Sequence, residues 1–302
     1  YDGEAYGWTR DLDAIRRTFQ WETEKLGLEY ADFGFLHCVD DPEDADAVIS
    51  GGLLDYLRSL KAEGRVRHIG FSSHDPAIAR RLLACGEIDL FMFSINPAFD
   101  MLPASEDSDT LFAEEFSAEL KGIDPEHAAL YSICEQHDVG ITVMKGYAGG
   151  RLFDAAASPF GVALTPVQCL HYALTRPAVA SVMVGVETVE QLEEALAYEG
   201  ATAAERDYAS VLAGAPKHAY MGQCTYCGHC APCPKGIDVA LVTKFFNLAK
   251  AQGGVPETVR EHYALLAHPA GECVACGACE KCCPFGVPVI ANMAGARQLF
   301  GR

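Results

Sequence analysis

Nine of the thirteen cysteines in this 302-residue chain fall into two short clusters in its last third. Each cluster supplies four closely spaced cysteines and ends in a Cys-Pro pair: Cys224, Cys227, Cys230 and Cys233 precede Pro234, and Cys273, Cys276, Cys279 and Cys283 precede Pro284. The Cys-x2-Cys-x2-Cys spacing lets three thiolates converge on one iron–sulfur cubane, whose fourth corner needs a remote ligand. The two clusters therefore predict two [4Fe-4S] centres.

The pairing of the cysteines follows from the way two-cluster ferredoxins use the cysteine before proline, which ligates the other cluster. We therefore expect Cys283 to complete the set that begins at Cys224, and Cys233 to complete the set that begins at Cys273. The first motif has only two residues before its last cysteine, whereas the second has three. Cys282 is surplus, and is either a free thiol at the cluster rim or a substitute for Cys283.

Zinc is the competing metal, but it prefers two separated Cys-x2-Cys pairs for each tetrahedral site. Disulfides would suit a secreted protein, whereas tight clustering favours metal ligation in a reducing compartment. The four scattered cysteines lie in or beside apolar segments, and we expect them to be small core residues: Cys38, Cys85, Cys134 and Cys169.

The net charge of −19 argues against nucleic acid as a partner, because binding it needs clustered Lys and Arg. No apolar run reaches the roughly 20 residues of a membrane-spanning helix, and no signal sequence opens the chain. We expect a cytoplasmic protein without membrane contact.

The first two thirds of the chain alternate between helical and short β patterns. Strands are expected at 33–36, 68–71, 90–95, 140–144 and 179–184, and helices at 12–26, 53–62, 77–83, 125–137, 166–174 and 189–197. Such alternation predicts an α/β fold with a parallel sheet. Between the cysteine motifs, residues 239–251 and 258–267 show helical spacing, so we expect the cysteine region to be mainly helical.

Several segments now carry a resemblance: Ala31-Asp32-Phe33-Gly34-Phe35-Leu36-His37, Gly64 to Ser72, Met144 to Gly150, and Val184-Gly185 followed by Glu190 to Glu194. Together they resemble aldo/keto reductases, and the whole resembles the bacterial branch with a C-terminal ferredoxin-like region. The resemblance implies a (β/α)8 TIM barrel. The domains expected are a partial barrel at 1–205, a linker at 206–218 and a ferredoxin-like domain with two [4Fe-4S] clusters at 219–302.

Only five of the eight β/α units are expected in this sequence, and they correspond to the fourth to eighth of the family. Five strands do not close such a barrel, and an open edge exposes unpaired backbone groups. We expect that roughly 80 residues, or three β/α units, belong before Tyr1.

The resemblance implies carbonyl chemistry by a tyrosine, a lysine, an aspartate and a histidine, of which His37 matches the histidine that orients the carbonyl. The other three roles fall on the strands that this sequence does not contain. Asp2, Tyr6 and Gly7 imitate the aspartate-tyrosine motif, but no room remains for the lysine strand before His37, so we interpret them as a decoy loop.

For a nicotinamide cofactor, the resemblance implies a contact from Ser72 near the carboxamide, and the pair Gly149-Gly150 would let the backbone approach the pyrophosphate. Lys145 is a candidate cation for an anionic substrate or cofactor, and Glu194 is a further candidate cofactor residue. Ordinary turn glycines and a solvated lysine are equally compatible with these positions. Met92 and Met144 replace residues that relatives use for the carboxamide and for ring stacking. Glu187 and Glu190 would repel a 2′-phosphate, so the residues at 185–191 do not favour NADP.

The leading hypothesis is a nicotinamide-dependent iron–sulfur oxidoreductase of the aldo/keto reductase type that acts on a small carbonyl or alcohol, with or without a redox partner protein. The alternatives are an electron-transfer protein whose barrel binds a partner or ligand without carbonyl reduction, and an inactive scaffold stabilised by its clusters. The acidic stretch from Asp100 to Glu119 is expected to be a surface loop or lid.

Overall fold

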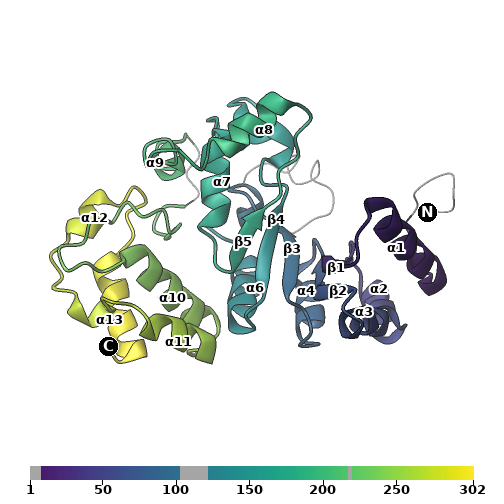
Figure 1. Cartoon of the computed structure of the whole chain (residues 1–302). Helices are drawn as coiled ribbons and strands as arrows, with labels where there is room; N and C mark the ends of the chain where they lie inside the picture. The colour runs from purple at the N-terminus through teal and green to yellow at the C-terminus, as the bar shows by residue number, and fades with distance from the viewer. Residues whose placement is uncertain (1–7, 103–121, 217–219) are drawn as a thin grey trace. The chain divides into compact units, whose positions relative to one another are not determined.

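The computed structural model describes residues 8–102, 122–216 and 220–302 (Figure 1). Its contacts divide the chain into two compact units, residues 1–92 and 93–302. In the α/β part the elements are α1 (Leu12–Leu26), β1 (Ala31–Leu36), α2 (Pro42–Ser50), α3 (Leu53–Ala62), β2 (Val66–Ser72), α4 (Pro76–Leu83), β3 (Leu90–Ser94), α6 (Pro125–Gln136), β4 (Gly140–Met144), α7 (Pro166–Leu174), β5 (Val179–Val182), α8 (Val189–Leu196) and α9 (Tyr208–Ala213). The cysteine region adds α10 (Val239–Ala251), α11 (Glu257–Ala264), α12 (Ala278–Cys282) and α13 (Val289–Phe300).

The five strands follow one another in the order β1-β2-β3-β4-β5 in one sheet. The pairs β1–β2, β2–β3 and β4–β5 are parallel. This arrangement confirms the α/β fold with a parallel sheet that the alternating pattern predicts. Because parallel strands all point the same way, their C-terminal ends gather the loops in which sites of such folds are built.

In the first unit, α3 packs against the sheet through its apolar face. Leu53, Leu57 and Leu60 lie one turn apart and are buried, as expected for one stripe of a helix. Gly34 in β1 makes this packing close, because a Cβ there would lie 3.1 Å from both Leu57 and Val66. A glycine is therefore needed where the helix crosses the strand.

In the second unit, α7 begins with a capping box in which Thr165 and Gln168 satisfy each other's backbone N–H groups, with Pro166 at the first helical position. The Gln168 side chain also donates to the carbonyl oxygen of Asp207 (3.0 Å), just before α9. Helix α10 packs against α6, α11 and α13, and Figure 1 shows α10, α11 and α13 lying together.

Several sequence-based expectations need correction. The expected linker at 206–218 contains α9, and the helix expected at 258–267 spans Glu257–Ala264. Helices α2, α12 and α13 were not expected, because two of them are short and α13 has only weak amphipathicity. The domain boundaries at 205 and 219 stay a prediction.

The scattered cysteines do not behave alike. Cys134 and Cys169 are fully buried core residues, as expected, but Cys38 and Cys85 are partly exposed. Asp100 also departs from expectation: it is fully buried, because it accepts hydrogen bonds inside the second unit. Met101 and Leu102 are also buried, and residues 103–119 of the acidic stretch lie outside the described residues, as do Asp2, Tyr6 and Gly7. No helix in the described part of the chain is long and apolar enough to cross a membrane.

Candidate functional site

The eight cysteines of the two motifs surround two separate cavities in the second unit. The first cavity is lined by Cys224, Cys227, Cys230 and Cys283, and the second by Cys233, Cys273, Cys276 and Cys279. Each cavity therefore combines three cysteines of one motif with the Cys-Pro cysteine of the other. These are the two groups that the exchange of remote ligands predicts. Cys282 is exposed and lines neither cavity.

The two motifs share one backbone design. Two residues after the first cysteine of each motif, Tyr226 and Ala275 adopt a left-handed conformation, with φ of 57° and 53°. Two residues further on, Gly228 and Gly277 do the same, with φ of 81° and 75°. Because left-handed residues reverse the chain tightly, the intervening thiols turn toward a common centre.

The same correspondence continues after each Cys-Pro pair. Gly236 and Gly286, each three residues beyond the cysteine, have positive φ, and α10 and α13 both begin six residues beyond it. Val239, the first residue of α10, lines both cavities. Each motif therefore ends in a helix that packs beside its own cavity and against the other helix.

The donor set fits an iron–sulfur cluster in each cavity. Apart from the thiols, the first cavity is lined mainly by small and apolar side chains, and its lining contains no carboxylate. Burial raises the pKa of Cys224 and of Cys230 to about 12, so these thiols are protonated unless a cation compensates the thiolate charge. Backbone N–H groups of Ala275 and Val287 approach the sulfurs of Cys273 and Cys283 at 3.4 and 3.5 Å.

A buried arginine ties the first cysteine loop to helix α7. The Arg176 guanidinium donates to the carbonyl oxygen of Thr225, which also accepts from the Tyr208 hydroxyl at 2.6 Å. Arg176 is 1% exposed, and its guanidinium lies over the rings of Tyr172 and Tyr226, at 4.3 and 5.1 Å from their centres. The peptide that follows Cys224 is therefore held by the fold of the preceding part of the same unit.

A second polar cluster lies beside this arginine. The Asp100 carboxylate accepts hydrogen bonds from the hydroxyls of Tyr131 and Tyr172, and the Tyr172 and Tyr220 hydroxyls lie 3.0 Å apart. Tyr220 stands four residues before Cys224 and also donates to the carbonyl oxygen of Pro97. Burial and the neighbouring carboxylate raise the pKa of Tyr131 and Tyr172 well above 10, so both remain hydrogen-bond donors.

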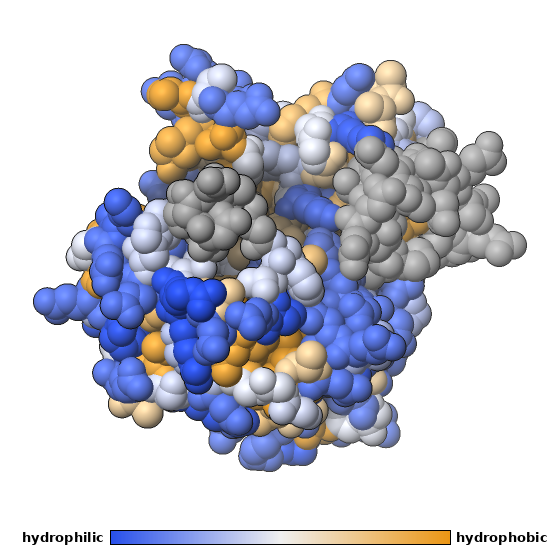
Figure 2. Space-filling model, turned by 90° about the vertical axis from the view of Figure 1, so that its right-hand side faces the viewer, coloured by the Kyte–Doolittle hydropathy of each residue, from blue (hydrophilic) through white to orange (hydrophobic). Residues whose placement is uncertain are grey.

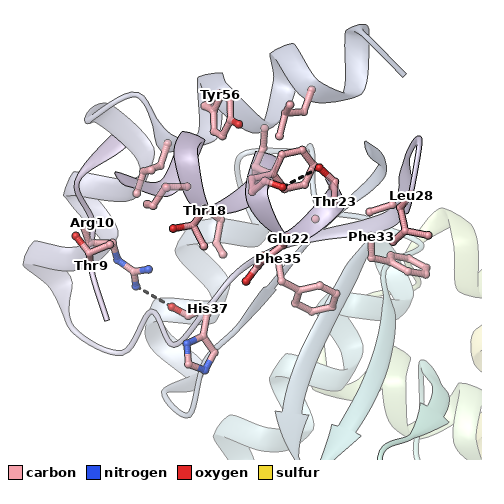
Figure 3. A pocket seen from close by; sticks show the side chains of 18 of the residues that line it. Thr9, Arg10, Thr18, Glu22, Thr23, Leu28, Phe33, Phe35, His37 and Tyr56 are labelled. Carbon is pink, nitrogen blue, oxygen red and sulfur yellow. Dashed lines mark hydrogen bonds between the residues drawn. The ribbon is translucent and has the colours of Figure 1, made fainter. Parts of the chain in front are cut away.

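His37 lies directly after β1 in the first unit, and its side chain is exposed. Its carbonyl oxygen accepts a hydrogen bond from the Arg10 guanidinium at 2.8 Å, as Figure 3 shows. Ser72 lies at the end of the neighbouring strand β2 and is buried, and its hydroxyl oxygen accepts from the Cys38 N–H at 2.7 Å. The structure thus places these two predicted residues at adjacent strand ends.

A pocket of about 440 Å³ also lies in the first unit, between α1, β1 and α3. Its lining includes Phe33 and Phe35 from one face of β1 and Gly34 and Leu36 from the other, because successive strand residues point to opposite faces. The pocket therefore runs along the edge of β1 that does not pair with β2. Figure 3 shows that His37 stands at the border of this group of residues. On the face of the molecule drawn in Figure 2, hydrophobic residues (orange) reach the surface among hydrophilic ones (blue).

The remaining predicted cofactor residues belong to the second unit. Lys145 follows β4 with a left-handed φ of 56°, and Gly149 and Gly150 continue the loop at φ of 64° and 82°. Space for a Cβ exists at both glycines, so their role is to permit the backbone conformation. Glu194 lies on α8 and is exposed.

Two functional candidates near these sites were not expected from the sequence. Tyr147 lies in the same loop as Lys145, and burial raises its pKa to about 12; its hydroxyl has no hydrogen-bond partner among the described residues. Arg176 was also missed, because only the folded chain brings it to Thr225. Arg176 stands just beyond the apolar helix α7, which ends at Leu174, and this placement was the one available signal.

Comparison with known proteins gives the family. The family model described as "Aldo/keto reductase family" matches residues 9–212. No curated protein matches the chain.

Solved structures of aldo/keto reductases share only a small part of their sequence with this chain. An aldo-keto reductase from Bacillus halodurans, in its holo form, is 20% identical with a TM-score of 0.48, and the match covers 67% of each chain. An aldo/keto reductase from Klebsiella pneumoniae in complex with NADP and acetate is 18% identical with a TM-score of 0.41, over 61% of this chain and 59% of that one. Because the family model covers well over half of the sequence, the chain belongs to the aldo/keto reductase family of oxidoreductases.

Proposed function

We propose that this protein is an iron–sulfur oxidoreductase that interconverts a small carbonyl compound and its alcohol with a nicotinamide cofactor and holds two [4Fe-4S] clusters. The observation that carries the proposal is the division of eight cysteines into two groups of four around two cavities. Nicotinamide-dependent reduction of small carbonyl compounds is typical of the family to which the chain belongs.

The choice of iron over zinc rests on how the thiols are grouped. Three ligands of each group come from one short loop and the fourth from a Cys-Pro pair in the other motif, an arrangement typical of iron–sulfur proteins. When bound, each [4Fe-4S] cluster would exchange one electron at a time.

In the α/β part we assign His37 to orient the substrate carbonyl and Ser72 to the carboxamide end of the cofactor. Lys145, Gly149 and Gly150 are assigned to the cofactor, and so is Glu194 on α8. Glu187 and Glu190 are exposed carboxylates before and within α8, and they favour NAD over NADP because a 2′-phosphate would be repelled. The tyrosine, lysine and aspartate roles have no assigned counterpart among the described residues.

An anaerobic titration with NADH and with NADPH tests this proposal. The visible absorbance of the clusters and the oxidation of the nucleotide are followed together, first without and then with a panel of small aldehydes. We expect nucleotide oxidation that depends on aldehyde, with NADH preferred, and a marked loss of rate in His37→Gln. Nucleotide oxidation that is absent with every aldehyde, or unchanged in His37→Gln, would contradict the assignment of carbonyl chemistry.

An electron-transfer protein is the second candidate function. The observation that favours it is the exposure of Cys276 and Val274 at the second cavity, which would bring a cluster close to the surface and to a redox partner protein. Reduction of the clusters by an artificial donor and reoxidation by an acceptor protein, with no nucleotide oxidation, would favour this function.

A further inference from the structure

Three side chains with metal-binding donor atoms meet at the ends of two neighbouring strands in the first unit. Cys38 and Asp40 follow β1, and His74 follows β2. The Cys38 sulfur and the His74 Nδ1 each lie 3.0 Å from Oδ2 of Asp40, and the three donor atoms all lie within 4.8 Å of one another. None of these three residues lines either cysteine cavity.

The spacing of these atoms is close to that of a tetrahedral zinc site. With about 2.3 Å for Zn–S and about 2.0–2.2 Å for Zn–N and Zn–O, two ligand atoms stand roughly 3.3–3.6 Å apart. The two observed 3.0 Å separations therefore need to widen by a few tenths of an ångström, and the Cys38 sulfur and the His74 Nδ1 lie within 4.8 Å of each other. The Cys38 thiol donates a hydrogen bond to Asp40. Its proton therefore lies between two donor atoms that a cation would bridge.

The surroundings hold the three residues in place. The other carboxylate oxygen of Asp40, Oδ1, accepts from the Ser73 hydroxyl at 3.0 Å and from the His74 N–H at 2.5 Å. Such hydrogen bonds orient a ligating carboxylate. Cys38 has a left-handed φ of 53°, a conformation that costs free energy in a residue other than glycine and is held here by the Ser72 hydroxyl on its N–H.

Charge and access also suit a divalent cation. A Cys38 thiolate and the Asp40 carboxylate together balance the two charges of Zn²⁺ while His74 binds as the neutral ring. Arg10 donates to the carbonyl oxygen of Cys38 but is paired with Asp44 at 2.6 Å, so its charge is compensated. The His74 side chain remains 15% exposed, and this leaves an approach for a fourth ligand from solvent.

We propose that Cys38, Asp40 and His74 form a Zn²⁺ site whose fourth position is open to water or a substrate oxygen. Three protein ligands with an open position are typical of catalytic rather than structural zinc. On binding, the metal displaces the thiol proton, which passes to solvent, and no other bond is changed. The proposal does not depend on the oxidoreductase function proposed above.

Cobalt(II) is a suitable probe, because a thiolate bound to it gives a charge-transfer absorbance that carboxylates and imidazole do not give. The full chain is prepared anaerobically with its own metal content and titrated with Co²⁺. The variants are Cys38→Ser, Asp40→Asn and His74→Gln, and the control is Cys85→Ser, the other partly exposed cysteine of the same unit. Since all of them retain the eight clustered cysteines, any cobalt bound there contributes equally to the wild type and to each variant, and cancels when their uptakes or spectra are subtracted.

The wild type and Cys85→Ser should each take up one equivalent of Co²⁺ more than Cys38→Ser. The charge-transfer band of this equivalent should appear when cobalt is added to the wild type or to Cys85→Ser, and should be missing when cobalt is added to Cys38→Ser. Zn²⁺ should displace this equivalent. Asp40→Asn and His74→Gln should weaken its binding at least tenfold. Should Cys38→Ser fail to fold by circular dichroism, these two variants decide the matter. Equal cobalt uptake and equal spectra in the wild type and the folded variants would overturn the proposal.

Discussion

The two cysteine cavities share a backbone design but differ in what surrounds them. The first is enclosed by buried residues, among them Thr225, Phe285 and Val287, and its loop is held by Arg176. The second has exposed residues in its lining, including Cys276 and Val274. The surroundings of the first cavity are therefore more deeply buried than those of the second, although the cysteines of the first are themselves partly exposed.

Because of this difference, the two cysteine loops should differ in how strongly they affect the stability of the unit. A loop that a buried arginine and two buried tyrosines hold in place is coupled to the stability of the unit, because its loss leaves polar groups without partners. A loop at the surface is coupled less to stability and is more accessible to solvent and to other molecules. We expect substitutions around the first cavity to affect folding, and substitutions around the second cavity to affect the access of solvent and other molecules.

The largest effect is expected for Cys283→Ser, which sharpens the comparison by testing whether this residue, and not Cys282, is a cluster ligand. Although Cys283 lies in the second motif, it lines the first cavity, so its loss should lower the iron content from about eight to about four atoms per chain. Cys282→Ser is the matched control, since Cys282 is exposed and lines neither cavity. Loss of iron in the control and not in Cys283→Ser would show that the adjacent cysteine is the ligand.

Arg176→Met should lower the free energy of unfolding by roughly 2–4 kcal/mol, because it leaves the buried carbonyl of Thr225 with one donor fewer and removes a buried ring contact. Denaturant unfolding measures this change. Arg260→Met, at a side chain that is 51% exposed, should change it by less than about 0.5 kcal/mol. Equal effects of the two substitutions would show that the buried contacts of Arg176 do not stabilise the unit.

Asp100→Asn should lower the free energy of unfolding by about 1.5–3 kcal/mol, since the amide replaces a charged acceptor of two tyrosine hydroxyls. Asp32→Asn provides the control, because this carboxylate is 62% exposed in a surface ion pair. A thermal melt of both variants measures the difference. If Asp100→Asn melts at the wild-type temperature, the network beside the first cavity does not stabilise the unit.

The smallest effect is expected from the pH dependence of His127. This histidine is buried, packs edge-on against Phe93 and has no hydrogen-bond partner for either ring nitrogen among the described residues. Burial lowers its pKa below 6.5 in the folded state. The unfolded chain then binds the proton more readily, so the stability contribution is present above about pH 6.5 and falls as the pH falls, by at most about 1.4 kcal/mol per pH unit.

His127→Phe should remove that part of the acid-side decline in the free energy of unfolding. The measurement is denaturant unfolding at several pH values between 5 and 8. An unchanged slope in the variant would show that His127 is not the titrating group.

Much of the fold was predictable because it depends on local patterns. The strands at β1 to β5 were expected near their observed positions, since short apolar runs between helical segments mark a parallel sheet. The grouping of the cysteines was also expected, because in two-cluster ferredoxins the cysteine before proline ligates the other cluster. Short elements such as α2, whose nine residues have a weak apolar stripe, carry too little pattern to be found in this way.

What could not be predicted depends on contacts between distant residues. Arg176 and Thr225 are 49 positions apart, and Asp100 and Tyr172 are 72 apart. Asp100 belongs to an acidic stretch that suggests solvent exposure, and only its tyrosine partners explain its burial. Likewise Cys38 resembles a core residue in sequence, whereas its left-handed backbone and its neighbours Asp40 and His74 appear only in the folded strands.

The most direct test of this account is the content of iron and acid-labile sulfide in anaerobically purified protein. Two cavities with four thiolates each predict about eight iron and about eight sulfide per chain. Protein that is folded but contains neither iron nor sulfide, whatever other metal it holds, would contradict the account.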